Sequence, residues 1–256
     1  MKNRLLILIM CMLLLSMILY HGYQIISSSS EEEVYLQQMK EQENQIIEET
    51  YNRPGIVAKY PRFIAGGSKD EIDQWNQLIK TDFDKILHIY SFQPIPGPIP
   101  TPSGIIPASL QIIYDIKLNN NDLISIFYRA TFLSPYAAHP TELVYTTNID
   151  KVNNKRILLK DKVILNQAFV QNFRSWDMVG AEKENEEVKK AIKDYLKVMN
   201  DEDLLKGLKA ADLIGSGNIY DIYSYYTTDK VGISLGVPNY LGDHIEFEQE
   251  YKKLKK

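Results

Sequence analysis

Apolar and polar positions alternate through the middle of the chain in a way that is typical of three consecutive β-strands. The first run extends from Leu110 to Leu118 and the second from Ile124 to Phe132. Between them, Asn119 to Asp122 supplies residues that favour tight turns. After a corner at residues 134–140, a third strand is expected from Thr141 to Ile149. The pattern therefore predicts an antiparallel meander.

Apolar stripes with helical spacing lie on both sides of this meander. Ser68 and Glu71 match a capping box, and the stripe that follows predicts a helix from Lys69 to about Ile89. Three more helices are expected after the meander, at residues 165–176, 188–199 and 201–208. Either Asn200 or Asp201 can cap the last of them.

Strands are also expected at both ends of the domain. Ile56 to Ile64 forms a first strand, Ile219 to Thr227 and Val231 to Val237 form a hairpin, and Asp243 to Tyr251 closes the domain. One face of the second hairpin strand has almost no side chain, so another part of the protein must pack close to its backbone. The small residues of this face are Gly232, Ser234 and Gly236.

Together these elements predict an α+β fold. Its antiparallel sheet contains the N-terminal strand, the central meander and the C-terminal hairpin, and the helices pack on one face. We expect residues 53–256 to form this fold as a single extracytoplasmic domain.

The first residues of the chain have the pattern of a membrane segment. Lys2 and Arg4 precede an almost unbroken apolar run from Leu5 to Tyr20. Continued to Ile26, the run would reach roughly 33 Å as a helix, enough to cross a bilayer. Residues 1–26 are therefore expected to be a signal anchor, a single transmembrane helix whose N-terminus is cytoplasmic. The alternative is a cleaved signal peptide, which would leave a secreted protein.

An acidic segment follows the apolar run. Between Glu31 and Thr50 the chain has seven glutamates and one lysine. Residues 27–52 are interpreted as a solvated stalk that separates the domain from the membrane, and an acidic recognition arm is the alternative.

Composition excludes some classes of function. The formal net charge of −4 argues against a nucleic-acid partner. Cys11 is the only cysteine and lies in the apolar run, so the domain has no internal disulfide and no cysteine metal ligands. His21, His88 and His244 lack zinc-type spacing to His139. We therefore expect neither a metal nor a cofactor.

The candidate chemistry of the domain centres on His139, which lies beside Pro140 and close to Glu142. Such a histidine can contact a ligand or act as a general base, and it can also simply satisfy backbone groups at a tight turn. Glu246 and Glu248 share one strand face and are interpreted as exposed charges on an edge strand. No nucleophile elbow, His-Glu-x-x-His motif or phosphate loop is present, so no catalytic residue is predicted.

Tyrosine is abundant, with 17 residues, and several of them lie close together near the C-terminal hairpin. A long segment rich in proline and glycine, Gln93 to Pro107, is a further candidate surface, as is Tyr226. The predicted ligand-binding residues are Tyr136, His139, Glu142, Tyr220, Tyr223 and Tyr225.

Several short motifs occur in an order that resembles a known family. They are the corner Tyr136 to Pro140 (Tyr-Ala-Ala-His-Pro), a strand that ends at Asn148 to Asp150, the segment Arg156 to Asp161, and the Gly242-Asp243 corner near the C-terminus. The pattern is similar to the extracytoplasmic domain shared by the anti-sigma-V factor and the N-terminal region of the peptidoglycan deacetylase PdaC. The resemblance covers roughly residues 55–254.

This resemblance implies a wall-facing, non-catalytic module, which in the anti-sigma-V factor binds lysozyme. Only four residues precede the apolar run, so no sigma-binding part is expected, and the chain ends at Lys256, so no deacetylase part is expected either. The predicted function is a membrane-anchored module at the cell envelope that binds a wall glycan such as peptidoglycan, or a lysozyme-like protein. The alternatives are a wall-modifying hydrolase that uses His139 with a carboxylate, and a structural partner in an envelope complex.

Overall fold

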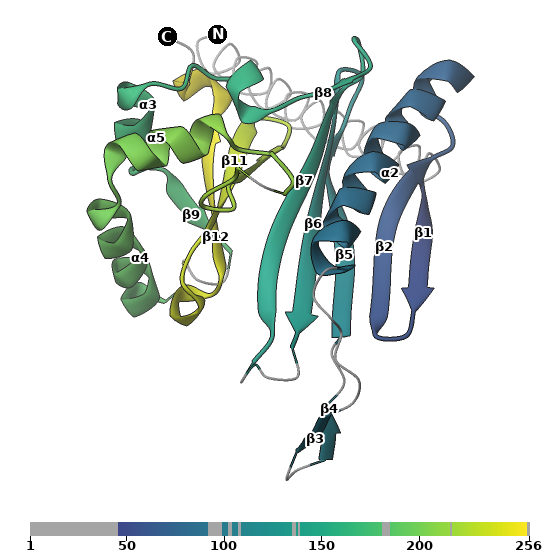
Figure 1. Ribbon diagram of the computed structural model, residues 1–256. Coiled ribbons are helices and arrows are strands. Elements are labelled where there is room, and N and C mark those ends of the chain that lie inside the picture. The colour runs from purple at the N-terminus through teal and green to yellow at the C-terminus, as the bar shows by residue number, and fades with distance from the viewer. Residues whose placement is uncertain are drawn as a thin grey trace, which may run out of the picture. The chain divides into compact units, whose positions relative to one another are not determined.

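The computed structural model describes residues 46–91, 99–101, 104–106, 109–134, 137, 139–180, 185–215 and 217–254. The chain divides into two compact units, Met1–Ile46 and Ile47–Lys256, and all the described residues except Ile46 belong to the second. Its strands form a six-stranded and a four-stranded sheet (Figure 1). The predicted signal anchor at residues 1–26 and residues 27–45 of the predicted stalk lie outside the described residues.

The predicted meander is the centre of the six-stranded sheet. Strands β5, β6 and β7 pair antiparallel in sequence order, as the alternating pattern predicts. The full strand order is β1-β2-β5-β6-β7-β8. The bounds are β1 (Ile46–Arg53), β2 (Ile56–Phe63), β5 (Ser109–Asn119), β6 (Leu123–Leu133), β7 (Thr141–Asp150) and β8 (Lys155–Arg156).

Strand β1 begins before the expected domain boundary. It includes residues 46–52, which the sequence assigns to the acidic stalk. Glu48 and Glu49 of this strand pair with Lys59 and Arg62 of β2, at 2.7 Å in each case. The last acidic residues of the segment therefore belong to the edge of the sheet, where charged side chains are common.

One pair of strands in this sheet is parallel. Residues 56–58 of β2 pair with residues 110–112 of β5 in the same direction. Helix α2 (Lys69–Ser91) lies between these strands in the chain and returns it to the end of the sheet where β2 began. Such a crossover joins parallel strands, whereas a tight turn joins antiparallel ones. The α+β class is confirmed, with this one exception to the antiparallel pairing.

Helix α2 covers one face of the six-stranded sheet (Figure 1), as the helical stripe predicts. The capping box is present, because Ser68 N donates to Glu71 Oε2 at 2.8 Å and Glu71 N donates to Ser68 Oγ at 3.4 Å. The aromatic ring of Phe63 packs edge-on against Trp75, with 6.1 Å between centroids. The buried residues of the stripe are Trp75, Ile79, Phe83, Ile86 and Tyr90.

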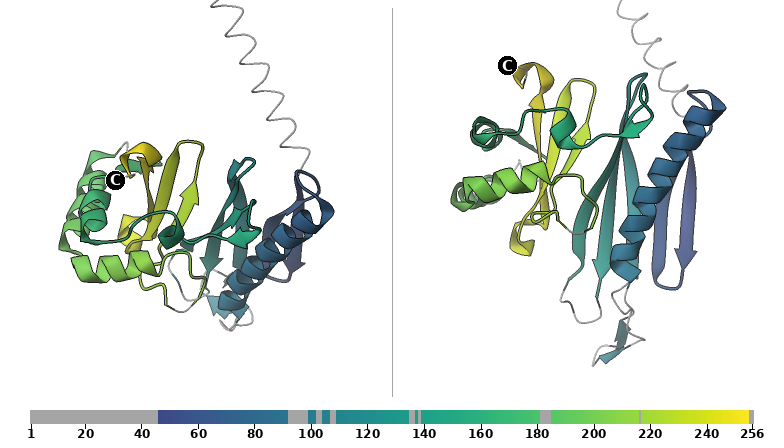
Figure 2. Two further views of the ribbon diagram at one scale, coloured as in Figure 1. Left: turned by 90° about the horizontal axis from the view of Figure 1, so that it is seen from above. Right: turned by 45° about the horizontal axis from the view of Figure 1, so that its top comes forward.

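The prediction that one sheet contains both the meander and the C-terminal hairpin is wrong, because the hairpin lies in a separate sheet with the order β10-β11-β12-β9. Its strands are β9 (Asp177–Val179), β10 (Tyr223–Tyr226), β11 (Lys230–Gly236) and β12 (His244–Glu250). The remaining helices lie beside this smaller sheet, whereas α2 lies on the larger one (Figure 2). They are α3 (Gln167–Phe173), α4 (Glu186–Val198) and α5 (Asp201–Lys209). Asn200 caps α5, which is one of the two predicted options.

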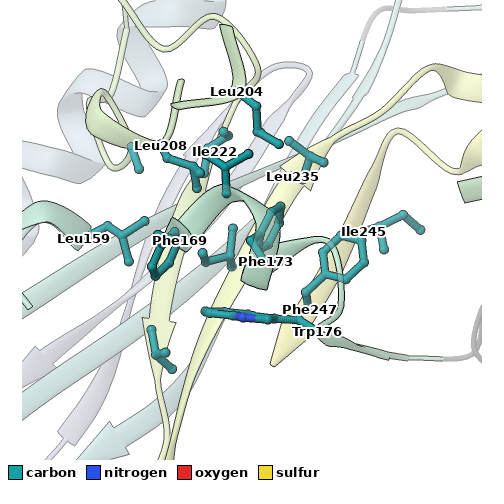
Figure 3. Packing of buried hydrophobic residues seen from close by; sticks show 14 of the residues in the cluster. Leu159, Phe169, Phe173, Trp176, Leu204, Leu208, Ile222, Leu235, Ile245 and Phe247 are labelled. Carbon is teal, nitrogen blue, oxygen red and sulfur yellow. The ribbon is translucent and has the colours of Figure 1, made fainter. Parts of the chain in front are cut away.

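Apolar side chains from these helices and strands form one continuous core. Phe173 packs edge-on against both Trp176 and Phe247, at centroid separations of 5.4 and 5.2 Å. Figure 3 shows these rings together with leucines of α5 and aliphatic residues of β11 and β12. Short 3-10 turns complete the connections: η1 (Leu159–Asp161), η3 (Asn239–Leu241) and η4 (Tyr251–Lys253).

Buried hydrogen bonds connect the two sheets, and we call this set of residues the polar seam. Asn148 Nδ2 donates to the carbonyl of Ser224 at 2.8 Å, and Ser125 Oγ donates to Asn148 Oδ1 at 2.7 Å. Tyr226 N donates to Ser125 Oγ at 2.9 Å. These side chains satisfy backbone groups of β10 where it lies beside the larger sheet. The polar seam consists of Ser125, Thr146, Asn148, Asp212 and Ser224.

Asp212 is the charged member of the seam and is 1% exposed. Its Oδ1 accepts from Ser224 N at 2.5 Å and from Thr146 Oγ1 at 3.3 Å. Its Oδ2 accepts from Leu159 N at 2.7 Å and from Ser224 Oγ at 2.8 Å. Burial raises the pKa of the Asp212 carboxyl, and the bonds from Ser224 and Leu159 and the charge of Arg156 oppose that rise. Four donors therefore satisfy both oxygens.

The small face of β11 is closely covered, as the sequence predicts. A Cβ atom on Gly232 would lie 2.1 to 2.4 Å from ring carbons of Tyr225. A Cβ atom on Gly236 would lie 2.8 Å from the carbonyl oxygen of Tyr220. Within the segment rich in proline and glycine, β3 (Ile99–Thr101) and β4 (Gly104–Ile106) form a two-stranded ribbon.

Candidate functional site

Most of the predicted tyrosine surface belongs to the core. Tyr223 is 1% exposed and Tyr225 is 3% exposed, and Tyr226 is also buried. The rings of Tyr223 and Tyr225 pack on Tyr145 and Phe127 of the larger sheet, at 5.2 and 5.3 Å between centroids. Strand β10 belongs to the smaller sheet and also contacts β5, β6 and β7 of the larger one, and all four of its residues are buried. These tyrosines therefore do not form a surface that a ligand contacts.

The other two predicted tyrosines, Tyr220 and Tyr136, do not extend this surface within the part of the chain that the structure describes. Tyr220 is half-buried, and its ring packs so close to Gly207 that a Cβ atom there would lie 2.8 Å from Tyr220 Cδ2. Tyr136 lies outside the described residues.

His139 and Glu142, by contrast, lie together on the surface with residues from a distant part of the chain. Asn239 Nδ2 lies 3.2 Å from His139 Nδ1, and Asp243 Oδ2 accepts from Glu142 N at 2.9 Å. Asn239 Nδ2 also donates to Asp243 Oδ1 at 2.9 Å. We call His139, Glu142, Asn239, Asp243 and His244 the histidine corner. It joins the start of β7 to the turn between β11 and β12.

Local backbone geometry explains the position of these side chains. Gly242 and Asp243 both have positive φ, of 108° and 69°. Glycine tolerates that conformation without strain, and aspartate is one of the few other residues that adopt it readily. The sharp corner directs the Asp243 carboxylate to the backbone of Glu142. Two motifs of the family resemblance, the Ala-His-Pro corner and the Gly-Asp corner, therefore meet here.

A half-buried contact between His244 and Glu246 supports the histidine corner. His244 Nδ1 lies 2.6 Å from Glu246 Oε1, which also accepts from Ser234 Oγ at 3.1 Å. Burial alone would raise the pKa of Glu246, but the hydrogen bond and charge of His244, with smaller contributions from Ser234 and Arg129, lower it below its ordinary value. This pair fixes the ring of His244 on β12.

The second nitrogen of His244 is buried close to Glu142. His244 Nε2 lies 3.9 Å from Glu142 Oε2, too far for a hydrogen bond, and has no hydrogen-bond partner among the described residues. Glu142 is 52% exposed in its side chain, whereas His244 is 11% exposed. A buried imidazole nitrogen without a hydrogen bond to any described residue therefore lies close to the exposed carboxylate of Glu142.

Strand β12 is not the edge strand that the sequence suggests. It lies between β11 and β9, and the side chains of Glu246 and Glu248 are 15% and 16% exposed. Glu248 accepts from Tyr225 Oη at 3.0 Å and pairs with Lys230 at 3.0 Å. Charged groups survive in an inner strand here because each carboxylate has a partner.

The turn that completes the corner also carries an exposed aromatic residue. Tyr240 of η3 is 80% exposed and lies in the chain between Asn239 and the turn at Gly242 and Asp243. The exposed groups of this surface are a carboxylate, an amide, an imidazole and a phenol, which supply both donors and acceptors. Within the described ranges, no group of three or more His, Cys, Asp or Glu side chains could hold a metal ion.

The sequence did not identify Asn239, Tyr240 or His244 as site residues. The Gly242-Asp243 corner was the only signal near them, and it carried no information about its contact with β7. A hundred residues separate His139 from Asn239, so only the fold brings them together.

Solved structures of DUF3298 family proteins are similar to this chain. One, from Pseudomonas aeruginosa PAO1, has a TM-score of 0.46 and 15% identity, and the match covers 82% of this chain and 90% of that one. Another, from Bacteroides fragilis NCTC 9343, has a TM-score of 0.43 and 13% identity, with 81% and 89% covered. No family model and no curated protein matches the sequence.

None of the helices between Ile46 and Leu254 that the structure describes has the length and apolar character needed to span a membrane. The apolar run at residues 5–26 lies outside that range, so the signal anchor stays a prediction. The link to the anti-sigma-V factor and the deacetylase likewise remains a resemblance of sequence motifs.

Proposed function

We propose that this protein is a non-catalytic binding module of the bacterial cell envelope, and that the histidine corner binds a wall glycan. The N-terminal apolar run holds the module at the membrane in this proposal. One observation carries it: the fold places His139 and Glu142 beside Asn239 and Asp243 on an exposed surface, and the exposed Tyr240 follows Asn239 in the chain.

The chemistry of this surface suits a sugar. Hydroxyl groups both donate and accept hydrogen bonds, and the corner offers carboxylates, an amide and an imidazole that complement them. A tyrosine ring supplies an apolar contact at low entropic cost, and its hydroxyl stays in water. The half-buried pair of His244 and Glu246 supports this arrangement before the ligand arrives, which limits the ordering cost of binding.

The test is calorimetric titration of the full chain, kept in a detergent without sugar groups, with soluble muropeptides. We expect saturable binding, and we expect Tyr240→Ala and Glu142→Gln each to weaken it about tenfold, the loss of one central contact. Glu202→Gln is the control, because this exposed carboxylate lies on α5 and has no contact with the corner. Unchanged affinity in both Tyr240→Ala and Glu142→Gln would overturn the proposal.

The same samples separate the alternatives. Binding of a lysozyme-like protein without any response to muropeptides would make that protein the ligand. Release of new reducing ends from the glycan would favour the hydrolase, with His139 and the carboxylate of Glu142 as its first candidates. In cells that express the gene, recovery of the protein in the culture medium with its N-terminal residues removed would replace the anchor by a cleaved signal peptide.

A further inference from the structure

A cavity of 410 Å³ lies on the four-stranded sheet's side of the domain, between the end of α3, strand β9 and helix α4. None of its residues belongs to the histidine corner. Its volume is within the range of small-molecule pockets. Figure 1 shows the helix and the strand that border it.

The walls of this cavity combine two kinds of surface. Trp176, Leu196 and Phe247 are buried core residues that form its apolar side. Figure 3 shows Trp176 and Phe247 next to each other in the core. The indole Nε1 of Trp176 already donates to Asn172 at 2.8 Å, so Trp176 presents no free donor to a ligand.

The other side of the cavity is strongly basic. Lys189, Lys193 and Lys197 follow one another at intervals of four residues, which places them on one face of α4. Arg174 adds a fourth positive charge, and Asp177 is the only carboxylate among the described lining residues. This local excess of positive charge contrasts with the negative charge of the whole chain.

Arg174 is held in place by bonds that use only part of its guanidinium. Its Nη2 donates to the carbonyl of Met199 at 2.8 Å and to Asp201 Oδ1 at 2.5 Å. Its Nη1 is buried and has no hydrogen-bond partner among the described residues. Arg174 therefore contributes a fixed positive charge beside the cavity, and arginine is a common residue at phosphate sites.

The lysines are available to a ligand. Lys189 and Lys197 form pairs with Glu186 and Asp194 of the same helix, at 3.0 and 2.9 Å, and both of those carboxylates are more than half exposed. Exposed pairs of this kind contribute about 0 to 1 kcal/mol, so a phosphate group can replace them at little cost. The described residues provide no ion-pair partner for Lys193.

We propose that this cavity binds a phosphate ester with an apolar organic part. The phosphate lies against the lysines of α4 and the charge of Arg174, and the organic part lies against the apolar side formed by Trp176 and Phe247. Both a soluble phosphate ester and a phospholipid head group have this chemistry. The volume of the cavity favours the soluble ligand, because a cavity of this size can hold a small molecule, whereas a membrane offers a flat surface.

The first measurement is the titration of the full chain, in uncharged detergent, with phenyl phosphate and with inorganic phosphate. Phenyl phosphate is expected to bind more tightly, because only it contacts the apolar side. Lys193→Gln is expected to weaken its binding about tenfold through the loss of a charged contact. Lys190→Gln is the matched control, because it is the same change on the same helix at a lysine outside the cavity lining.

The same titration has several outcomes that would overturn the proposal. Equal effects of the two lysine variants would reduce the site to general attraction of anions. Equal affinity for phenyl phosphate and inorganic phosphate would remove the apolar part. A response only to micelles that contain phosphatidylglycerol, and not to phenyl phosphate or to phosphatidylcholine micelles, would turn the helix face into a membrane-contact surface. A muropeptide response does not depend on this cavity, so the proposed glycan site can stand or fall separately.

Discussion

The polar seam and the histidine corner are built from the same kinds of residues and have opposite consequences. Both join parts of the chain that are far apart in sequence, and both rely on an aspartate with positive φ, Asp212 in the seam and Asp243 in the corner. In the seam the carboxylate is 1% exposed and four donors satisfy it. In the corner the carboxylate is partly exposed and accepts two bonds.

The difference shows that burial, rather than residue type, decides whether a polar group stabilises the fold or remains available to a ligand. A buried group must be satisfied internally, since an unpaired one costs free energy. An exposed group can exchange its water for a ligand. The seam therefore fixes how the two sheets meet, and the corner is free to bind.

The largest expected effect comes from making the same substitution in both regions. Asp212→Asn replaces one acceptor oxygen by an amide that faces backbone and hydroxyl donors, and should lower the free energy of unfolding by about 3 kcal/mol. Asp243→Asn should cost less than about 1 kcal/mol, because water can satisfy the exposed group. Asparagine tolerates positive φ, so the backbone contributes little to either value. Urea denaturation of both variants measures this, and equal losses would contradict the comparison.

An effect of intermediate size on stability is expected when the pH changes the charge of Glu246, which pairs with His244. The pKa of Glu246 in the folded protein lies below its ordinary value, so its ionised form adds stability at neutral pH. This contribution is present above the ordinary pKa of the carboxyl and is lost as the pH falls below about 5 and through the lowered pKa.

Denaturation between neutral and acidic pH, in the wild type and in Glu246→Gln, isolates this term. The variant should be less stable at neutral pH, and the difference between the two proteins should shrink on acidification. A constant difference would mean that the charge of Glu246 does not contribute and that the bond to His244 is equally good with a neutral partner.

The smallest effect on stability is expected at Tyr240, the exposed residue that follows Asn239 of the histidine corner. Tyr240→Ala removes a side chain that is 80% exposed, so the free energy of unfolding should change by less than about 0.5 kcal/mol. The same variant is expected to weaken glycan binding, so stability and binding separate at this position. A large loss of stability would assign Tyr240 to the fold, and the binding loss would then no longer identify a ligand contact.

The elements themselves were largely predictable from local patterns. Helix α2, its capping box and its buried stripe are as expected, and so are the three strands of the meander and the α+β class. The close cover over Gly232 was also predicted, because a strand face without side chains requires a near neighbour. These features depend on residues a few positions apart.

The candidate site was predicted only in part. His139 and Glu142 were identified, and they do lie on the surface, whereas Tyr223 and Tyr225 are in the core. An aromatic strand has the same alternation whether one face or both faces are covered. Asn239 and His244 gave no signal, since their importance comes from a contact across a hundred residues.

The sequence by itself determined the long helix, the meander and most of the other elements, because hydrophobic periodicity, caps and turn residues act over a few neighbouring positions. It did not predict β1, the β3-β4 ribbon or β9. Tertiary structure alone decided that the strands divide into two sheets, that β2 and β5 run parallel, and that β10 is covered on both faces. It also decided that the Ala-His-Pro and Gly-Asp corners meet. Burial and long-range contact depend on the path of the whole chain, and no local pattern contains that path.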